Sequence, residues 1–228
     1  MKISQQTIEI LKNFAKINPN FIVDEPSQLI RTSIVGNSTV ALASVPETLP
    51  KFAVYDLNEF LSLAAAFTDP EFDFGDTSVQ ISSGRSKFRY AYCSERLIEV
   101  KAPKNLKTPD PSVVIEKLEK ASMKTLLQAA SSLSVEKIHF KSVDGKIVAE
   151  AVSDKNGGSS NTFSIELADS PAGKSFELIM DVSDFRFIVA DYKVEFFGKK
   201  AVLFSSNLGQ DHSIKYLVSL NSASTMEG

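Results

Sequence analysis

The chain has few of the residues on which most enzyme and metal sites depend. Its 228 residues include one cysteine, Cys93, two histidines, His139 and His212, and no tryptophan. A single cysteine excludes a disulfide within the chain and is typical of a reducing compartment. Two histidines leave little for a histidine-rich metal site.

Long apolar runs and an excess of positive charge are also missing. The longest apolar stretch lies around residues 61–67, far short of the roughly 20 residues that a membrane-spanning helix needs. Residues 1–20 lack the continuous apolar core of a signal peptide. The formal net charge is −3, which excludes a general electrostatic attraction for nucleic acid. Any contact with DNA must therefore be local.

The sequence motifs of common enzymes are absent as well. The chain has no phosphate-binding loop, dinucleotide fingerprint, nucleophile elbow or zinc-protease motif. Cys93 and His139 are expected to have structural roles, and His212 is expected to lie in a solvated loop. We therefore predict no catalytic residue, no metal and no cofactor. The alternative, a hydrolase or transferase with an unfamiliar site, requires perturbed titratable groups that converge in a pocket.

Apolar periodicity and turn residues predict an α+β chain. Helices are expected over Ser4–Lys16, Asp56–Phe67, Ser122–Leu133 and Asp181–Ala190, with Ser4 and Asp56 as N-caps. Short strands are expected between them, including Arg96–Lys101 and Thr162–Leu167, and Asp144-Gly145 predicts a hairpin.

Two halves of the chain follow one plan. The helix starts at Ser4 and Ser122 are 118 residues apart, and those at Asp56 and Asp181 are 125 apart. Such near-equal offsets indicate an internal duplication. The segment 101–111, rich in proline and lysine, is typical of an extended connector. We expect a first domain over 1–100 and a second over 112–228, each with helices on one face of an antiparallel sheet.

A set of basic residues lies opposite the apolar faces of the predicted helices or close to them. Solvation alone commonly explains such a pattern, but a shared surface that approaches phosphate is the sharper hypothesis. The candidates are Lys12, Lys16, Lys120, Lys124 and Arg186.

Several segments, in the same order along the chain, resemble the DNA polymerase sliding clamps of T-even-type bacteriophages. They are Met1–Ser4, Leu11–Ala15, Val54–Leu61, Asp144–Val148 and Ala223–Thr225. The resemblance extends over essentially the whole chain. It implies a homotrimer whose six domains close around duplex DNA, with helices lining the hole. It also implies that the five basic residues face DNA.

The resemblance implies partners too. They are the C-terminal peptide of the replicative polymerase, an ATP-driven clamp loader and late transcription factors, in the cytoplasm of an infected bacterium. Related clamps hold such peptides in an apolar pocket near the connector. The corresponding candidates in this chain are Ile34, Val40, Leu106, Leu217 and Leu220. The alternative from another class is a monomeric two-domain adaptor that binds peptides and never encircles DNA. The mass of the protein in solution separates the two.

Overall fold

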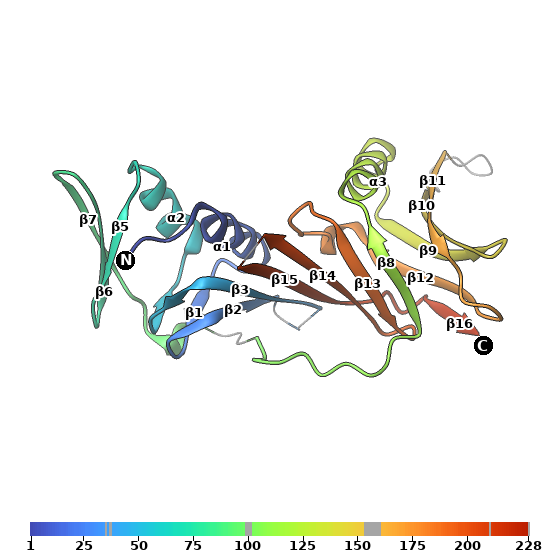
Figure 1. Cartoon of the computed structure of the whole chain (residues 1–228), viewed down its shortest axis with the longest axis horizontal. Coiled ribbons are helices and arrows are strands. Elements are labelled where there is room, and N and C mark those ends of the chain that lie inside the picture. Colours follow the sequence, from blue (N-terminus) through green and yellow to red (C-terminus); the bar gives the residue numbers. More distant parts are fainter. Residues whose placement is uncertain (35, 37, 99–101, 153–160, 210, 228) are drawn as a thin grey trace. The chain divides into compact units, whose positions relative to one another are not determined.

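The chain forms two compact units. The computed structural model describes residues 1–34, 36, 38–98, 102–152, 161–209 and 211–227 (Figure 1). Unit 1 consists of Met1–Lys104 together with Asn207–Ile214. Unit 2 consists of Asn105–Ser206 together with Lys215–Gly228. Each unit combines antiparallel strands with helices, as the α+β prediction requires.

Unit 1 contains two α-helices, several short strands and one 3-10 turn. The helices are α1 (Gln5–Ile17) and α2 (Leu57–Ala65), and the turn is η1 (Glu95–Leu97). Strand β1 pairs with β4, β2 pairs with β3, and β5, β6 and β7 form a three-stranded sheet. The bounds are β1 (Phe21–Val23), β2 (Ser27–Ser33), β3 (Thr39–Leu49), β4 (Phe52–Val54), β5 (Glu71–Phe74), β6 (Ser78–Ser83) and β7 (Ser86–Ala91).

The core of unit 1 lies between its helices and strands. Helix α1 packs on α2 and on β2 and β3, and it buries Ile10 and Phe14 completely. The Phe52 ring lies among four other aromatic rings, with centroid distances between 5.2 and 6.4 Å. Each such buried side chain contributes roughly 1.5–3 kcal/mol of transfer free energy. The predicted N-caps are confirmed: Ser4 Oγ accepts from Thr7 N, and Asp56 accepts from Asn58 N and Glu59 N.

In its described residues, unit 2 contains one α-helix, one 3-10 turn and two series of antiparallel strands. The helix is α3 (Lys120–Leu133), which packs on β10 and β11. One sheet has the order β11-β10-β9-β12-β16, and another series has the order β15-β14-β13-β8. The bounds are β8 (Val113–Leu118), β9 (Lys137–Val143), β10 (Lys146–Val152), β11 (Thr162–Asp169), β12 (Ser175–Asp181), β13 (Tyr192–Phe197), β14 (Ala201–Gly209), β15 (His212–Ser219) and β16 (Thr225–Glu227).

The first of these sheets has an apolar and a charged face. Ile138 and Phe140 of β9 are fully buried on one face. On the other face, the Nδ1 of His139 lies 2.7 Å from a Glu177 oxygen, and Lys141 donates to Glu150 at 2.6 Å. This alternation follows from the two-residue period of a strand. Helix α3 therefore covers one face, and charged pairs occupy the opposite face. The predicted hairpin at Asp144-Gly145 is confirmed, since Val143 pairs with Lys146 and both turn residues have positive φ.

The helix predicted over Asp181–Ala190 is wrong. Only Val182–Asp184 form a single 3-10 turn, η2, and the chain is irregular from residue 185 to 190. Two buried tyrosines hold this segment open: Tyr216 Oη accepts from Ile188 N at 3.2 Å, and Tyr192 Oη donates to Ile188 O at 2.5 Å. The Phe187 ring stacks on Tyr216 with a centroid distance of 4.4 Å. These tertiary contacts take the backbone groups that a helix would have paired.

The strand predicted over Arg96–Lys101 is also wrong where the structure can be compared. Residues 95–97 form η1, which Ser94 caps by accepting from Arg96 N, and residues 99–101 lie outside the described residues. Residues 102–111 have no regular secondary structure. No helix among the described residues is long and apolar enough to cross a bilayer.

Candidate DNA-facing and partner-binding surfaces

Helix α3 presents an exposed face without any acidic residue. Its sequence, from Lys120 to Leu133, contains no Asp or Glu. Met123, Leu126 and Ala130 are buried, whereas Lys124 is exposed on another face. Of the helices described, α3 is therefore the one whose own residues can approach a phosphate backbone without repelling it.

The first turn of α3 is less favourable for an anion. Glu119 provides no side-chain cap, and Asp191 instead accepts from Lys120 N at 2.7 Å. Lys117 lies 3.7 Å from the same aspartate and 3.4 Å from Glu119. The two carboxylates next to Lys120 offset part of its positive charge. Lys124, one turn further along, is the stronger candidate.

Helix α1 carries a mixed stripe on its exposed side. Lys12 donates to Glu9 at 2.9 Å, and Gln5 donates to the same carboxylate at 2.9 Å. Lys16 is exposed in the last turn. Because Glu9 neutralises Lys12, the stripe is only weakly positive. Such a surface suits transient contact with phosphate better than tight binding.

Arg186 does not lie on a helix. It is exposed on the irregular segment after η2, where its Nε donates to Ser183 O at 3.0 Å. Its guanidinium is therefore oriented by a neighbouring carbonyl rather than by helical periodicity.

The predicted peptide-pocket residues differ in exposure and unit. In unit 1, Val40 is buried on β3, and Ile34 is half-buried just after β2, where its N–H donates to Thr39 O at 3.0 Å. In unit 2, Leu106 and Leu217 are half-buried, and Leu220 is 9% exposed. Leu217 alternates with the buried Tyr216 on β15, so the two side chains face opposite sides of that strand.

A polar cluster at the start of α1 was missed from the sequence. Glu47 on β3 accepts from Ser4 N at 2.5 Å and from the Thr7 hydroxyl at 2.7 Å. His212 Nε2 lies 3.2 Å from Ser4 Oγ and 3.1 Å from Thr7 Oγ1. The expectation that His212 lies in a solvated loop is wrong, because it is a half-buried residue of β15.

This cluster is a capping box completed from a distant strand. In the local form, a glutamate at the third helical position accepts from the N-cap backbone N–H. Here Thr7 occupies that position, and Glu47 supplies the carboxylate from 40 residues away. Burial raises the pKa of Glu47, but the hydrogen bonds from Thr7 and Ser4 outweigh it and hold the pKa below its ordinary value. The cluster fixes α1 to β3 and to the β14–β15 hairpin.

The described residues show neither an activated thiol nor a cluster of metal ligands. Burial raises the pKa of the Cys93 thiol, which disfavours the thiolate needed for nucleophilic attack. Nowhere in the described part of the chain do three or more His, Cys, Asp or Glu side chains gather to hold a metal ion.

Comparison with known proteins finds similar chains among bacteriophage sliding clamps. No family model matches the chain. Over 233 residues it is 28% identical to the sliding clamp of Escherichia phage RB69, covering 99% of both chains. It is also 28% identical over 200 residues to the sliding clamp of Vibrio phage KVP40, and 26% identical over 204 residues to that of Enterobacteria phage T4. These matches cover 85% and 87% of this chain, and 89% and 88% of the relatives.

Over most of its length the chain is similar to the sliding clamps of T4-type phages. The fold of the chain agrees with that similarity. It matches PCNA of A. fulgidus, in a structure with the C-terminal region of FEN-1, with a TM-score of 0.72 over 94% of each chain and 13% identity. It also matches PCNA of Thermococcus kodakaraensis with a TM-score of 0.68, 12% identity and 95% and 96% coverage. The two-domain clamp fold is thus shared with chains of very different sequence.

Proposed function

We propose that this chain is the subunit of a sliding clamp that encircles duplex DNA and tethers the replicative DNA polymerase for processive synthesis. The observation that carries this proposal is the 28% identity to the RB69 sliding clamp over 99% of both chains. A clamp performs no covalent chemistry, so the proposed activity needs no catalytic residue, metal or cofactor. We assign one clamp domain to each unit, joined by the connector at 101–111.

A closed ring retains DNA by topology, and its contacts with phosphate need only be weak. The net charge of −3 is compatible with this, because acidic residues elsewhere do not prevent a local basic surface. We assign DNA-facing roles to Lys12 and Lys16 on α1, to Lys120 and Lys124 on α3, and to Arg186. The exposed face of α3, which contains no Asp or Glu, provides the main support for this assignment.

The ring is proposed to be a homotrimer joined head to tail through strand edges. Within the described residues, β7 ends the sheet of unit 1 and β11 ends a sheet of unit 2. Lys87 and Arg89 are exposed on β7, whereas Glu166 and Asp169 are exposed on β11. Edges of opposite charge that both lack a partner strand suit a heterologous joint. We therefore assign β7, and not the predicted strand Arg96–Lys101, to the joint with β11, which includes the predicted strand Thr162–Leu167.

Partners are assigned on the same basis. We propose that the C-terminal peptide of the polymerase binds an apolar pocket that includes Ile34, Val40, Leu106, Leu217 and Leu220. An ATP-driven clamp loader opens the ring, and late transcription factors use the same clamp. All of this takes place in the cytoplasm of the infected bacterium.

Charge reversal tests the encirclement of DNA. The variant combines Lys12→Glu, Lys16→Glu and Lys124→Glu, and its control combines Lys199→Glu, Lys200→Glu and Lys215→Glu, which are exposed outside the helices. Light scattering first establishes whether each protein has a mass of about three chains. Primer extension with the cognate polymerase and loader then measures product length. We expect short products only for the helix variant.

Two outcomes would contradict the proposal. Equal product lengths for the helix variant and the wild type would remove the DNA-facing assignment. A wild-type chain that stays monomeric at high concentration would favour the peptide-binding adaptor instead.

A further inference from the structure

The connector changes from buried to exposed close to its start. Ile98 is 4% exposed in a small apolar cluster with Ile22 and Ala53, and Ala102 is 6% exposed. From Pro103 to Asn105 the chain is exposed, and Figure 1 draws it as an extended segment that continues to residue 111. The burial of the connector against unit 1 therefore ends at Ala102.

An acidic turn of unit 1 faces this point, and its conformation does not depend on the connector. Arg31 donates to both carboxylate oxygens of Asp24 at 2.8 Å, with only 11% of the arginine side chain exposed. Ser27 Oγ accepts from Leu29 N at 2.9 Å within the same turn. Burial raises the pKa of Asp24, but Arg31, helped by Lys104, outweighs it and holds the pKa below its ordinary value. Both bonds come from Nη2 of Arg31, and this largely buried pair holds Asp24 in place within the turn.

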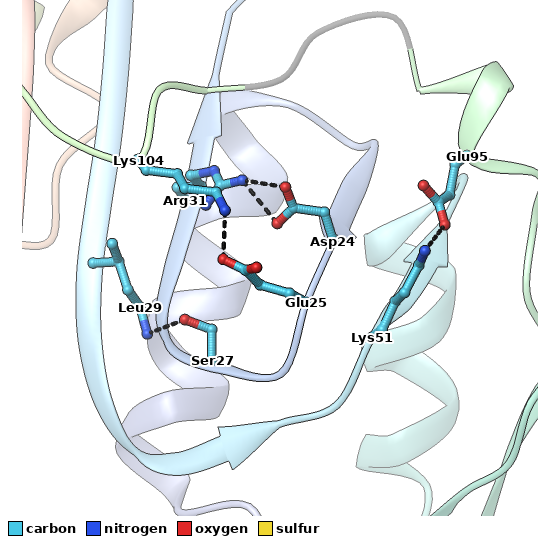
Figure 2. Close-up of polar contacts among 8 residues, drawn as sticks. All are labelled: Asp24, Glu25, Ser27, Leu29, Arg31, Lys51, Glu95 and Lys104. Atoms are coloured by element: carbon cyan, nitrogen blue, oxygen red, sulfur yellow. Dashed lines mark hydrogen bonds and ion pairs between the residues drawn. The ribbon is translucent and has the colours of Figure 1, made fainter.

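The next residue of that turn holds the connector. Glu25 accepts from Lys104 Nζ, as Figure 2 shows beside the Arg31–Asp24 pair. The two side chains are 61% and 53% exposed, so water and salt reach both. Among the described connector residues, 102–111, this is the single side-chain hydrogen bond or ion pair. Asp24 is engaged by Arg31 through both of its carboxylate oxygens.

We propose that the Glu25–Lys104 ion pair is an electrostatic latch that orders the start of the connector. When the latch is closed, the connector is held on unit 1 from Ala102 to Lys104. When it opens, the chain is free from residue 103 onward. Exposed ion pairs of this kind shift an equilibrium by roughly two- to fivefold. The latch therefore opens readily at high ionic strength, because salt screens exposed charges.

The consequence for partner binding rests on the proposed function. A peptide that binds near the connector must order it, which costs conformational entropy. This entropic cost of binding is smaller when the connector is already ordered. We therefore expect the latch to favour peptide binding, by up to the same two- to fivefold factor. The latch itself can be tested without any partner, which separates it from the clamp assignment.

Limited trypsin digestion of the full chain measures the latch directly. Lys107 lies in the exposed part of the connector and is a cleavage site. In low salt, Glu25→Gln is expected to raise the initial rate of cleavage after Lys107 roughly two- to fivefold. At about 1 M salt the wild-type and variant rates should converge, because the Debye length falls to about 3 Å. The charge swap Glu25→Lys with Lys104→Glu should restore slow cleavage in low salt.

The matched control removes a neighbouring pair of similar exposure. Lys51 donates to Glu95 at 2.8 Å, and Lys51→Gln eliminates this bond without touching the connector (Figure 2). Cleavage after Lys107 should remain at the wild-type rate in this variant. An equal increase in both variants, or no increase in Glu25→Gln, would overturn the latch.

Affinity for a synthetic peptide of the polymerase C-terminus then tests the consequence. Calorimetry should give a dissociation constant two- to fivefold higher for Glu25→Gln than for the wild type, and no change for Lys51→Gln. Unchanged affinity in a variant with fast cleavage would show that the latch does not serve peptide binding. If the wild type binds no peptide while the proteolysis results hold, the proposed pocket fails and the latch stands.

Discussion

Replacing Glu47 removes the acceptor for two hydrogen bonds at the start of α1. Its carboxylate accepts from Ser4 N at 2.5 Å and from the fully buried Thr7 hydroxyl at 2.7 Å. A hydrogen bond to a charged group contributes about 1.5–3 kcal/mol. In Glu47→Ala, water can replace the acceptor at the partly exposed Ser4, and His212 remains beside Thr7. We therefore expect a loss of about 2 kcal/mol rather than the full sum, and about half of that for Glu47→Gln.

Thermal unfolding provides the assay. For a chain of this size, 1 kcal/mol corresponds to about 2–4 °C in Tm. Glu47→Ala should thus lower the Tm of the transition that includes unit 1 by about 4–8 °C. The control is Glu9→Gln on the same helix, where the exposed pair with Lys12 contributes less than about 1 kcal/mol.

The pH dependence has a definite sign. The pKa of Glu47 in the folded protein lies below its ordinary value of 4.5, so its stabilisation is complete at pH values above 4.5. The stabilisation is lost as the pH falls through the lower folded-state pKa. The difference between wild type and Glu47→Gln should therefore be constant near neutrality and narrow below pH 4.5. A difference that is independent of pH, or a Glu47→Ala variant as stable as the control, would refute this explanation of the cap.

Two further predictions concern the proposed ring and pocket. Glu166→Lys on β11 should place a positive charge against Lys87 and Arg89 of a neighbouring copy. The dissociation constant of the ring should rise by about tenfold, or about 1.4 kcal/mol. Light scattering over a concentration series measures this change, and an unchanged dependence of mass on concentration would argue against the β7–β11 joint. Leu106→Ala, at a half-buried position, should weaken binding of the polymerase peptide by about tenfold without lowering Tm. Calorimetry measures the affinity, and an unchanged dissociation constant would mean that Leu106 is not part of the pocket.

Local signals predicted the parts of the fold that depend on neighbouring residues. Ser4 and Asp56 cap α1 and α2 as expected, and Asp144-Gly145 forms the predicted hairpin. The family resemblance, drawn from short segments in order along the chain, is confirmed by the phage relatives. These features succeed because each is determined within a few residues.

The failures have one physical cause, which is contact between distant residues. The helix expected over Asp181–Ala190 is replaced by an irregular segment because Tyr192 and Tyr216 bind the backbone of Ile188. The role of Glu47 could not be predicted, since its partners lie 40 or more residues away. His212 was placed in solvent because the sequence around it is polar, yet it contacts Ser4 from 208 residues away. The DNA-facing and pocket residues stay predictions.

Asn207–Ile214 belong to unit 1, and this affects the order in which the protein can fold during its synthesis. The polypeptide builds most of unit 1 first, then unit 2, and supplies the last part of unit 1 near its end. During translation, the hydroxyls of Ser4 and Thr7 cannot contact His212 until that residue has been synthesised. The same holds for Gln6, which donates to the Leu208 carbonyl. Contacts of such long sequence separation form late and slow folding. A fragment cut at the connector would lack this hairpin, so excising the first half yields an incomplete unit rather than an independent domain.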